Sequence, residues 1–297
     1  MGTNAGTLRH RFKHDRLLLD GATGTELERR GVACPLPLWS AGALVDAPHV
    51  VEAIHRDYVE AGADIIVANT FRTNPRTLRN AGRSSDGPML NESAIELARR
   101  AARGRDVLIA ASLAPLEDCY HPERVPCDDE LQAEHAQMAA WLAAAGPDLV
   151  WIETMSTVRE LHAAATAVAE YDLPFAASVV VRETGELLSG DALEDAVAAV
   201  EPLGPLAVGL NCIPPRGMSD ILPRLRRLTA RPLAAYAHIG NPTPIRGWSY
   251  AQDVTPDQYA DYARQWLQLG ATVVGGCCGT TPAHTRAVRA IIDAGSA

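Results

Sequence analysis

The chain has 297 residues, of which 47% are hydrophobic and 21% charged, a size and balance typical of one large globular domain. Its formal net charge of -9 and sequence pI near 5.5 argue against nucleic acid or an anionic membrane as the partner. No apolar run approaches the roughly 20 residues that a membrane-spanning helix needs.

The first residues of the chain carry several basic side chains and no apolar segment of the kind found in a secretory signal. We expect residues 1–16 to be a disordered basic leader and residues 17–297 to form the folded domain. Six cysteines without a signal peptide suit a reducing cytosol better than a disulfide framework, which predicts a cytoplasmic protein. Lys13 is the single lysine, and its place in the leader excludes a Schiff-base mechanism.

After the leader, eight short apolar runs alternate with eight segments of helical pattern. The runs have the near-continuous apolar character of parallel strands covered on both faces. The predicted strands cover residues 17–19, 64–68, 107–111, 149–152, 175–180, 206–210, 233–237 and 272–274. The predicted helices cover residues 48–61, 92–103, 129–145, 156–169, 193–200, 219–228, 256–269 and 282–294. This order predicts an α/β fold, a single closed (β/α)8 TIM barrel, rather than an open doubly wound sheet.

The longest gaps between predicted elements, residues 72–90 and 114–128, follow the second and third strands. In barrel enzymes the loops at the carboxyl ends of the strands build the active site. Polar side chains that end the strands should therefore gather around one mouth of the barrel. These side chains are Asp20, Asn69, Thr70, Ser112, Glu153, Asn211, Cys212, His238, Cys277 and Cys278.

The cysteines at these strand ends suggest a metal site. Cys277 and Cys278 lie in a glycine-rich turn between the last strand and the last helix, and Cys212 follows the sixth strand. Three thiolates with one open position are the ligands of a catalytic zinc site, whereas a structural site has four protein ligands. We predict one zinc ion per chain at this site. The alternatives are a buried apolar role for Cys212, and free thiols or a strained vicinal disulfide for Cys277 and Cys278. The other cysteines (Cys34, Cys119 and Cys127) are interpreted as incidental thiols.

Asp20 and Glu153 extend from apolar strands into the predicted mouth. An unpaired carboxylate is costly there, so a cationic partner such as a substrate ammonium would stabilise both. A turn-capping role for Asp20 and a solvated loop position for Glu153 remain the alternatives. The glycines at residues 21–24 do not form a G-x-G-x-x-G fingerprint, which disfavours a dinucleotide site.

Together these features resemble the homocysteine S-methyltransferase family, whose zinc-dependent barrels bind homocysteine. The resemblance extends from the first strand to the eighth, over nearly all of the chain after the leader. It is carried by the segments Asp20–Leu27, Leu38–Ala41, Asn69–Phe71, Trp151–Thr154, Gly209–Cys212 and Gly275–Gly279. It implies that the protein makes methionine, with the homocysteine sulfur as the fourth ligand of the zinc.

The resemblance also implies roles for the residues that bind homocysteine. Asp20 and Glu153 would hold its amino group, and the backbone near Gly21 and the Asn69–Thr70 corner would face its carboxylate. A free thiol has a pKa of about 8.5, and zinc coordination converts it to the nucleophilic thiolate at neutral pH.

Two segments, residues 112–120 and 236–241, depart from the family pattern where the methyl donor should bind. A sulfonium such as S-methylmethionine or S-adenosylmethionine is the favoured donor, because its methyl group is already activated. Trp39, Tyr120 and His238 form a possible donor pocket, in which the Trp39 and Tyr120 rings could stack on a cationic methyl group. Core packing is the alternative for Trp39.

Several alternatives stay open at this point. The methyl group could come from betaine or from a separate corrinoid protein. A zinc-dependent lyase or hydrolase on the same barrel could use Glu153 or His238 as its base. A non-catalytic zinc- or thiol-binding barrel is a further alternative, and the oligomeric state is left open.

Overall fold

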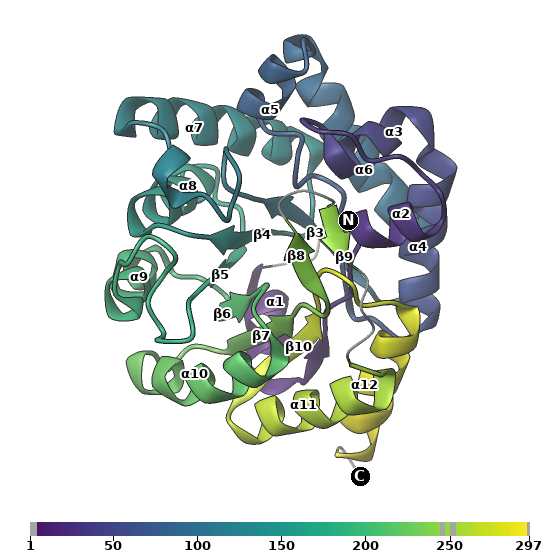
Figure 1. Ribbon diagram of the computed structural model, residues 1–297, viewed down its shortest axis with the longest axis vertical. Coiled ribbons are helices and arrows are strands. Elements are labelled where there is room, and N and C mark those ends of the chain that lie inside the picture. Colours follow the sequence, from purple (N-terminus) through teal and green to yellow (C-terminus); the bar gives the residue numbers. More distant parts are fainter. Residues whose placement is uncertain (1–4, 244–246, 250–253, 296–297) are drawn as a thin grey trace.

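The computed structural model describes residues 5–243, 247–249 and 254–295. Its central sheet comprises β1 (Leu17–Leu18), β2 (Ile65–Ala68), β3 (Leu108–Leu113), β4 (Leu149–Met155), β5 (Phe175–Val179), β6 (Val208–Asn211), β7 (Leu233–Ala237) and β10 (Ala271–Gly276). The eight strands pair in the order β1-β10-β7-β6-β5-β4-β3-β2, and every pair is parallel (Figure 1). A parallel bridge between Leu19 and Ile65 joins the two outer strands and closes the barrel. The predicted (β/α)8 fold is confirmed.

Helices surround the strands on the outside of the barrel (Figure 1). The major ones are α4 (Pro48–Glu60), α6 (Gly87–Ala101), α7 (Asp128–Ala145), α8 (Val158–Ala169), α9 (Leu193–Val200), α10 (Pro215–Leu228), α11 (Pro256–Gln268) and α12 (Pro282–Ala294). Shorter helical segments are α2 (Gly24–Arg29), α3 (Ala43–Asp46), α5 (Pro75–Asn80), η1 (Trp39–Gly42), η2 (Ser84–Asp86), η3 (Pro122–Arg124) and η4 (Glu201–Leu203). In α4 the buried residues Val51, Ile54 and Tyr58 share one face, as the helical period requires.

Side chains of the strands alternate between two apolar cores because successive residues of a strand point to opposite faces. On β4, Val150 and Ile152 belong to the core between the sheet and the helices. Leu149 and Trp151 belong to the core inside the barrel. By the same alternation Glu153 comes next on the inner face, at the carboxyl end of the strand.

The amino-terminal leader is ordered where the structure describes it. Residues Ala5–His14 form helix α1, so the prediction of a disordered leader is wrong for these residues, whereas residues 1–4 lie outside the described part. Leu8 and Phe12, one helical turn apart, are buried in the core inside the barrel. The ring of Phe12 lies 6.3 Å from that of Trp151, and burial of these two side chains holds the helix in place.

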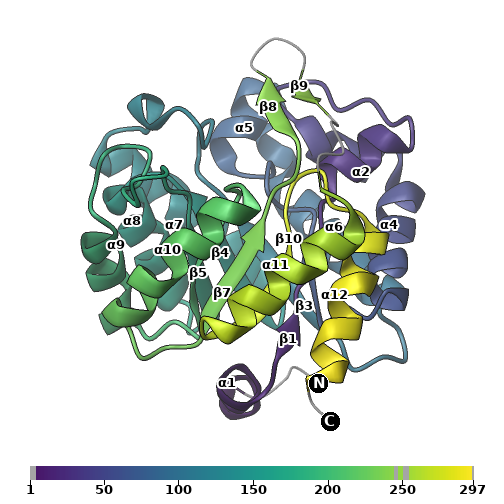
Figure 2. The same ribbon diagram turned by 60° about the horizontal axis from the view of Figure 1, so that its bottom comes forward.

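A short antiparallel hairpin, β8 (Asn241–Thr243) and β9 (Gly247–Ser249), follows β7 and was not predicted. Figure 2 shows this hairpin at one end of the barrel and α1 at the opposite end. Strands of three residues that include a proline carry too little alternation to be recognised in the sequence. Within the described part of the chain, no helix is both long enough and apolar enough to cross a bilayer.

Candidate functional site

Three cysteine sulfurs come together at the carboxyl ends of β6 and β10. The Sγ of Cys277 lies 3.0 Å from that of Cys212, which lies 4.0 Å from that of Cys278. All three sulfurs are within 4.8 Å of one another. Tetrahedral zinc with bonds of about 2.3 Å would separate its sulfur ligands by about 3.8 Å, so the three thiols fit a zinc ion. The barrel thus brings together the residues that the sequence separates.

Electrostatics favour one thiolate among the three. Hydrogen bonding with Cys277 and Cys278, and then with His238, lowers the pKa of Cys212 well below its usual range. Interaction with Cys212 is the main cause that raises the pKa of both Cys277 and Cys278. Three thiolates this close together would repel one another, so a bound cation is needed to keep all of them deprotonated.

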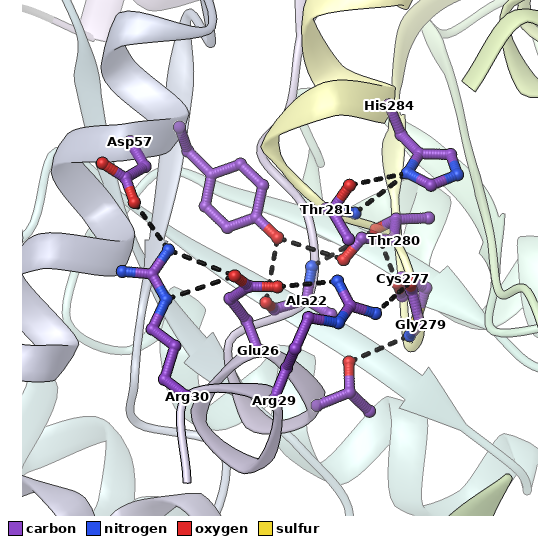
Figure 3. Close-up of polar contacts among 12 residues, drawn as sticks. Ala22, Glu26, Arg29, Arg30, Asp57, Cys277, Gly279, Thr280, Thr281 and His284 are labelled. Carbon is purple, nitrogen blue, oxygen red and sulfur yellow. Dashed lines mark hydrogen bonds and ion pairs between the residues drawn. The ribbon is translucent and has the colours of Figure 1, made fainter. Parts of the chain in front are cut away.

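The turn that carries Cys277 and Cys278 is held by hydrogen bonds to its own end and to helix α2 (Figure 3). The Thr280 hydroxyl donates to the Cys277 carbonyl at 2.7 Å. The Gly279 N–H donates to the Thr25 hydroxyl at 2.9 Å, and the Arg29 guanidinium donates to the Gly279 carbonyl at 3.4 Å. These bonds hold the backbone of the turn that follows β10 in place.

Two carboxylates are buried at the same end of the barrel. Asp20, which is 2% exposed, accepts a hydrogen bond from the Val67 N–H at 2.9 Å. Glu153, which is 8% exposed, accepts from the Ser112 hydroxyl at 2.6 Å and from the Tyr236 hydroxyl at 3.3 Å. Their depth excludes a solvated loop position for Glu153.

Both carboxyl groups are difficult to ionise in the free protein. Burial raises the pKa of Asp20 well above its usual value, the Val67 hydrogen bond opposes this shift, and the charge of Glu153 adds to it. Burial raises the pKa of Glu153 to about 7, partly offset by the hydrogen bond from Ser112. An ammonium group between the two carboxylates would favour their ionised forms.

The other predicted substrate residues are built into the same mouth. At Gly21 a Cβ atom would lie 2.8 Å from Thr280 Oγ1 and from the Tyr58 ring, so only glycine fits. The Asn69 amide donates to the Ser40 carbonyl at 2.8 Å, and the Thr70 hydroxyl donates to a main-chain carbonyl on β3 at 2.7 Å. These two side chains therefore support neighbouring loops, and their contact with a substrate stays a prediction.

Two of the three residues predicted for a donor pocket lie against the cysteines. The Tyr120 hydroxyl is 3.2 Å from the Sγ of Cys212, and His238 is hydrogen-bonded to the same sulfur. Trp39 packs edge-on against Phe71 at 6.1 Å between ring centroids, and its N–H donates to a carboxylate of α2 at 3.4 Å. Trp39 is thus tied to the loop that follows β2.

Some residues of the site had no role assigned from the sequence. Ser112 was recognised only as a polar strand end, and Tyr236 only as part of an apolar strand. Alternation on β7 could have placed Tyr236 inside the barrel, but not beside Glu153. Cys119, interpreted as incidental, is buried, and after burial the main cause that raises its pKa is the charge of Cys212. It therefore lies near the candidate metal site.

The model of the family described as homocysteine S-methyltransferase matches residues 17–292. Homocysteine S-methyltransferase of Escherichia coli (strain K12) is 33% identical over 298 residues, covering 94% of this chain and 96% of that protein. Selenocysteine methyltransferase of Astragalus bisulcatus is 29% identical over 313 residues, covering 94% of this chain and 93% of that protein.

Solved structures agree with the sequence relatives. The crystal structure of the metallated form of the homocysteine methyltransferase MmuM from Escherichia coli has a TM-score of 0.81 and 31% sequence identity to this chain. The match covers 94% of this chain and 96% of that one. The oxidized form of the same enzyme has a TM-score of 0.84, covering 97% and 99% of the two chains. With a family match over almost its whole length, the chain belongs to the homocysteine S-methyltransferase family.

Proposed function

We propose that the protein is a zinc-dependent homocysteine S-methyltransferase, which makes methionine from homocysteine and a small activated methyl donor. The observation that carries this proposal is the convergence of the Cys212, Cys277 and Cys278 sulfurs within 4.8 Å at the barrel mouth. Membership of the family and the two buried carboxylates at the same mouth support it.

The three cysteines would hold one zinc ion and leave one position for the substrate. Zinc, when bound, would keep the homocysteine sulfur in its nucleophilic thiolate form at neutral pH. The cysteines are free thiols and must stay reduced to bind metal, which supports a reducing compartment such as the cytoplasm.

The residues around the metal site would bind and orient homocysteine. Asp20 and Glu153 would pair with its ammonium group, and hydrogen bonds from Ser112 and Tyr236 keep the Glu153 carboxylate in place. The backbone at Gly21, with Asn69 and Thr70, would face the substrate carboxylate. Holding both ends of the acceptor places its sulfur for in-line attack on the methyl carbon, and such positioning can supply much of the rate enhancement.

A sulfonium, S-methylmethionine or S-adenosylmethionine, is the proposed donor because it carries its own neutral leaving group. Tyr120 and His238 both contact the Sγ of Cys212, and the Tyr120 ring could contact a cationic methyl group brought to this sulfur. Trp39 is a further candidate for this pocket.

Metal analysis of the purified protein and a panel of methyl donors test the proposal. We expect about one zinc per chain, and methionine formed from homocysteine with a sulfonium donor. Methyl transfer only from betaine or from a methylated corrinoid protein would support homocysteine as the acceptor and contradict a sulfonium as the donor. Zinc binding without transfer from any donor would contradict the proposal and favour a lyase, a hydrolase or a non-catalytic barrel.

A further inference from the structure

Four residues of the described chain have left-handed backbone conformations although they are not glycine, and two of them lie at the carboxyl ends of β4 and β6. These two are Thr154, with φ of 60°, and Cys212, with φ of 53°. A Cβ atom makes this region unfavourable, and residues held there are often found at functional sites. Thr154 directly follows Glu153, so the two outliers flank the proposed ammonium and metal sites.

The side chain of Asn211 joins these two positions. Its Oδ1 accepts a hydrogen bond from the Thr154 N–H at 2.9 Å, and its Nδ2 donates to Thr154 Oγ1 at 2.7 Å. Asn211 is fully buried and Thr154 is 2% exposed, so water cannot replace either bond. Asn211 also immediately precedes Cys212 in the chain.

This contact crosses a strand. In the sheet β5 lies between β4 and β6, so Asn211 on β6 reaches over the carboxyl end of β5 to Thr154 on β4. The pairing of β4 with β5 is irregular between Ile152 and Met155, the stretch that contains Thr154. Asn211 thus supplies a hydrogen-bond partner where the regular ladder is interrupted.

We propose that Asn211 and Thr154 are positioning residues that set the distance between the sulfur-binding and ammonium-binding ends of the acceptor site. We call this pair of hydrogen bonds the Asn211–Thr154 clamp. The clamp connects the residue before Cys212 to the residue after Glu153, so the two backbone turns cannot move independently. The inference rests on the proposed function for the identity of the two ends.

The clamp is tested with three single variants and one double variant. Thr154→Val removes the hydroxyl but keeps the branched Cβ, Thr154→Ser keeps the hydroxyl, and Asn211→Ala removes both bonds. Residues that orient metal ligands usually contribute about 10–100-fold in metal affinity. We expect a loss of that order in zinc affinity, measured by competition with a chelator, for Thr154→Val and Asn211→Ala. Thr154→Ser should stay close to wild type.

The double variant, Asn211→Ala with Thr154→Val, should bind zinc no more weakly than Asn211→Ala alone, because both changes remove the same interaction. Independent, additive losses would overturn the clamp. A lower melting temperature in the single variants with unchanged zinc affinity would also overturn it, since that result describes a purely structural role.

Acceptor length gives a second readout. Cysteine is one methylene shorter than homocysteine, and a single methylene is commonly worth about 10–200-fold in discrimination. If the clamp sets the spacing, the preference for homocysteine over cysteine, measured as the ratio of kcat/KM, should fall in Thr154→Val and be retained in Thr154→Ser. An unchanged ratio in Thr154→Val would contradict the proposal.

Alkylation of the metal-free protein separates failure of the clamp from failure of the proposed function. Iodoacetamide should modify Cys212 several-fold faster in Asn211→Ala and Thr154→Val than in wild type, because the strained turn can then open. The exposed Cys127 serves as the internal control and should react equally in all proteins.

Equal rates of Cys212 alkylation in the variants and in wild type would overturn the clamp even in an active methyltransferase. Wild type without zinc or methyl transfer would overturn the proposed function, and faster alkylation of the variants would still support the clamp.

Discussion

The hydroxyl of Tyr120 lies 3.2 Å from the Sγ of Cys212, although the two residues are 92 positions apart in the chain. The loop that carries Tyr120 is hydrogen-bonded to helix α8 and to the loop that follows β2. The Leu116 N–H donates to the buried Glu160 carboxylate at 2.8 Å, and the Arg72 guanidinium donates to the Glu117 carbonyl at 3.3 Å. The phenol is thus held against the proposed metal ligand by a loop that is hydrogen-bonded to two neighbouring segments.

Removing the Tyr120 hydroxyl should weaken this site without unfolding it. A hydrogen bond contributes about 0.5–1.5 kcal/mol, so we expect Tyr120→Phe to lower zinc affinity by about 2–10-fold. The KM for the methyl donor should rise as well, because Tyr120 borders the proposed donor pocket. Chelator competition and initial rates measure the two effects. Tyr171→Phe is the control, because Tyr171 is 46% exposed, and equal behaviour of the two variants would exclude a role for Tyr120.

Cys212→Ala and Cys277→Ala should each lose most of the bound zinc and the transferase activity. Each change removes one of three sulfurs that lie within 4.8 Å of one another, and two thiols hold zinc far less tightly than three. Elemental analysis and a methionine assay measure the losses. Cys127→Ala should retain both properties because Cys127 is exposed. Activity retained by Cys212→Ala would refute the proposed mechanism.

The use of homocysteine should depend on the ionisation of Glu153. Burial raises the pKa of this carboxyl to about 7, and only the ionised form attracts the substrate ammonium. We expect kcat/KM for homocysteine to rise with pH through about 7. In Glu153→Gln this rise should be lost and KM should increase about tenfold or more, as for other hydrogen bonds to charged groups. A wild-type pH profile retained by Glu153→Gln would exclude this role.

The same carboxyl group should make the free protein less stable as the pH rises. Its pKa is about 7 in the folded protein and 4.5 ordinarily, so the folded state binds the extra proton between these values. Stability from this group therefore falls as the pH increases from about 4.5 to about 7. We expect Glu153→Gln to melt at a higher temperature than wild type at pH 8 and to show a smaller difference at pH 5. A difference that does not change with pH would contradict this account.

Gly21→Ala should destabilise the protein and impair the site. A Cβ at this position would lie 2.8 Å from the Thr280 hydroxyl and the Tyr58 ring, and overpacking of this kind costs about 1–3 kcal/mol. Gly217→Ala is the matched control. Gly217 lies in α10 with open space around its Cα, and alanine is favoured over glycine in helices by about 1 kcal/mol. In denaturant unfolding, Gly21→Ala should therefore lower the free energy of unfolding relative to wild type, and Gly217→Ala should raise it.

Phe12→Ala tests whether α1 is part of the folded barrel. Phe12 is 1% exposed and packs against Trp151, and removal of a buried phenylalanine side chain costs about 3–5 kcal/mol. Leu36→Ala, at a side chain that is 79% exposed, should leave the free energy of unfolding almost unchanged. If the two variants were equally stable, α1 would not contribute to the core inside the barrel.

The sequence predicted the barrel well because parallel strands covered on both faces need continuous apolar runs, and these runs recur at regular intervals. It missed α1 and the β8–β9 hairpin for the same physical reason. A helix with two core residues and strands of three residues carry almost no periodic signal, and α1 is stabilised by the barrel against which it packs.

The residue types and strand-end positions of Cys212, Cys277 and Cys278 were sufficient by themselves to predict a zinc site on a (β/α)8 barrel. Only the tertiary structure decided which side chains support that site. The hydrogen bonds that orient Glu153, and the clamp between Asn211 and Thr154, join residues 41 to 83 positions apart. Such contacts depend on strand register, on an irregularity in β4 and on side-chain rotamers, none of which a linear pattern of apolar and polar residues encodes.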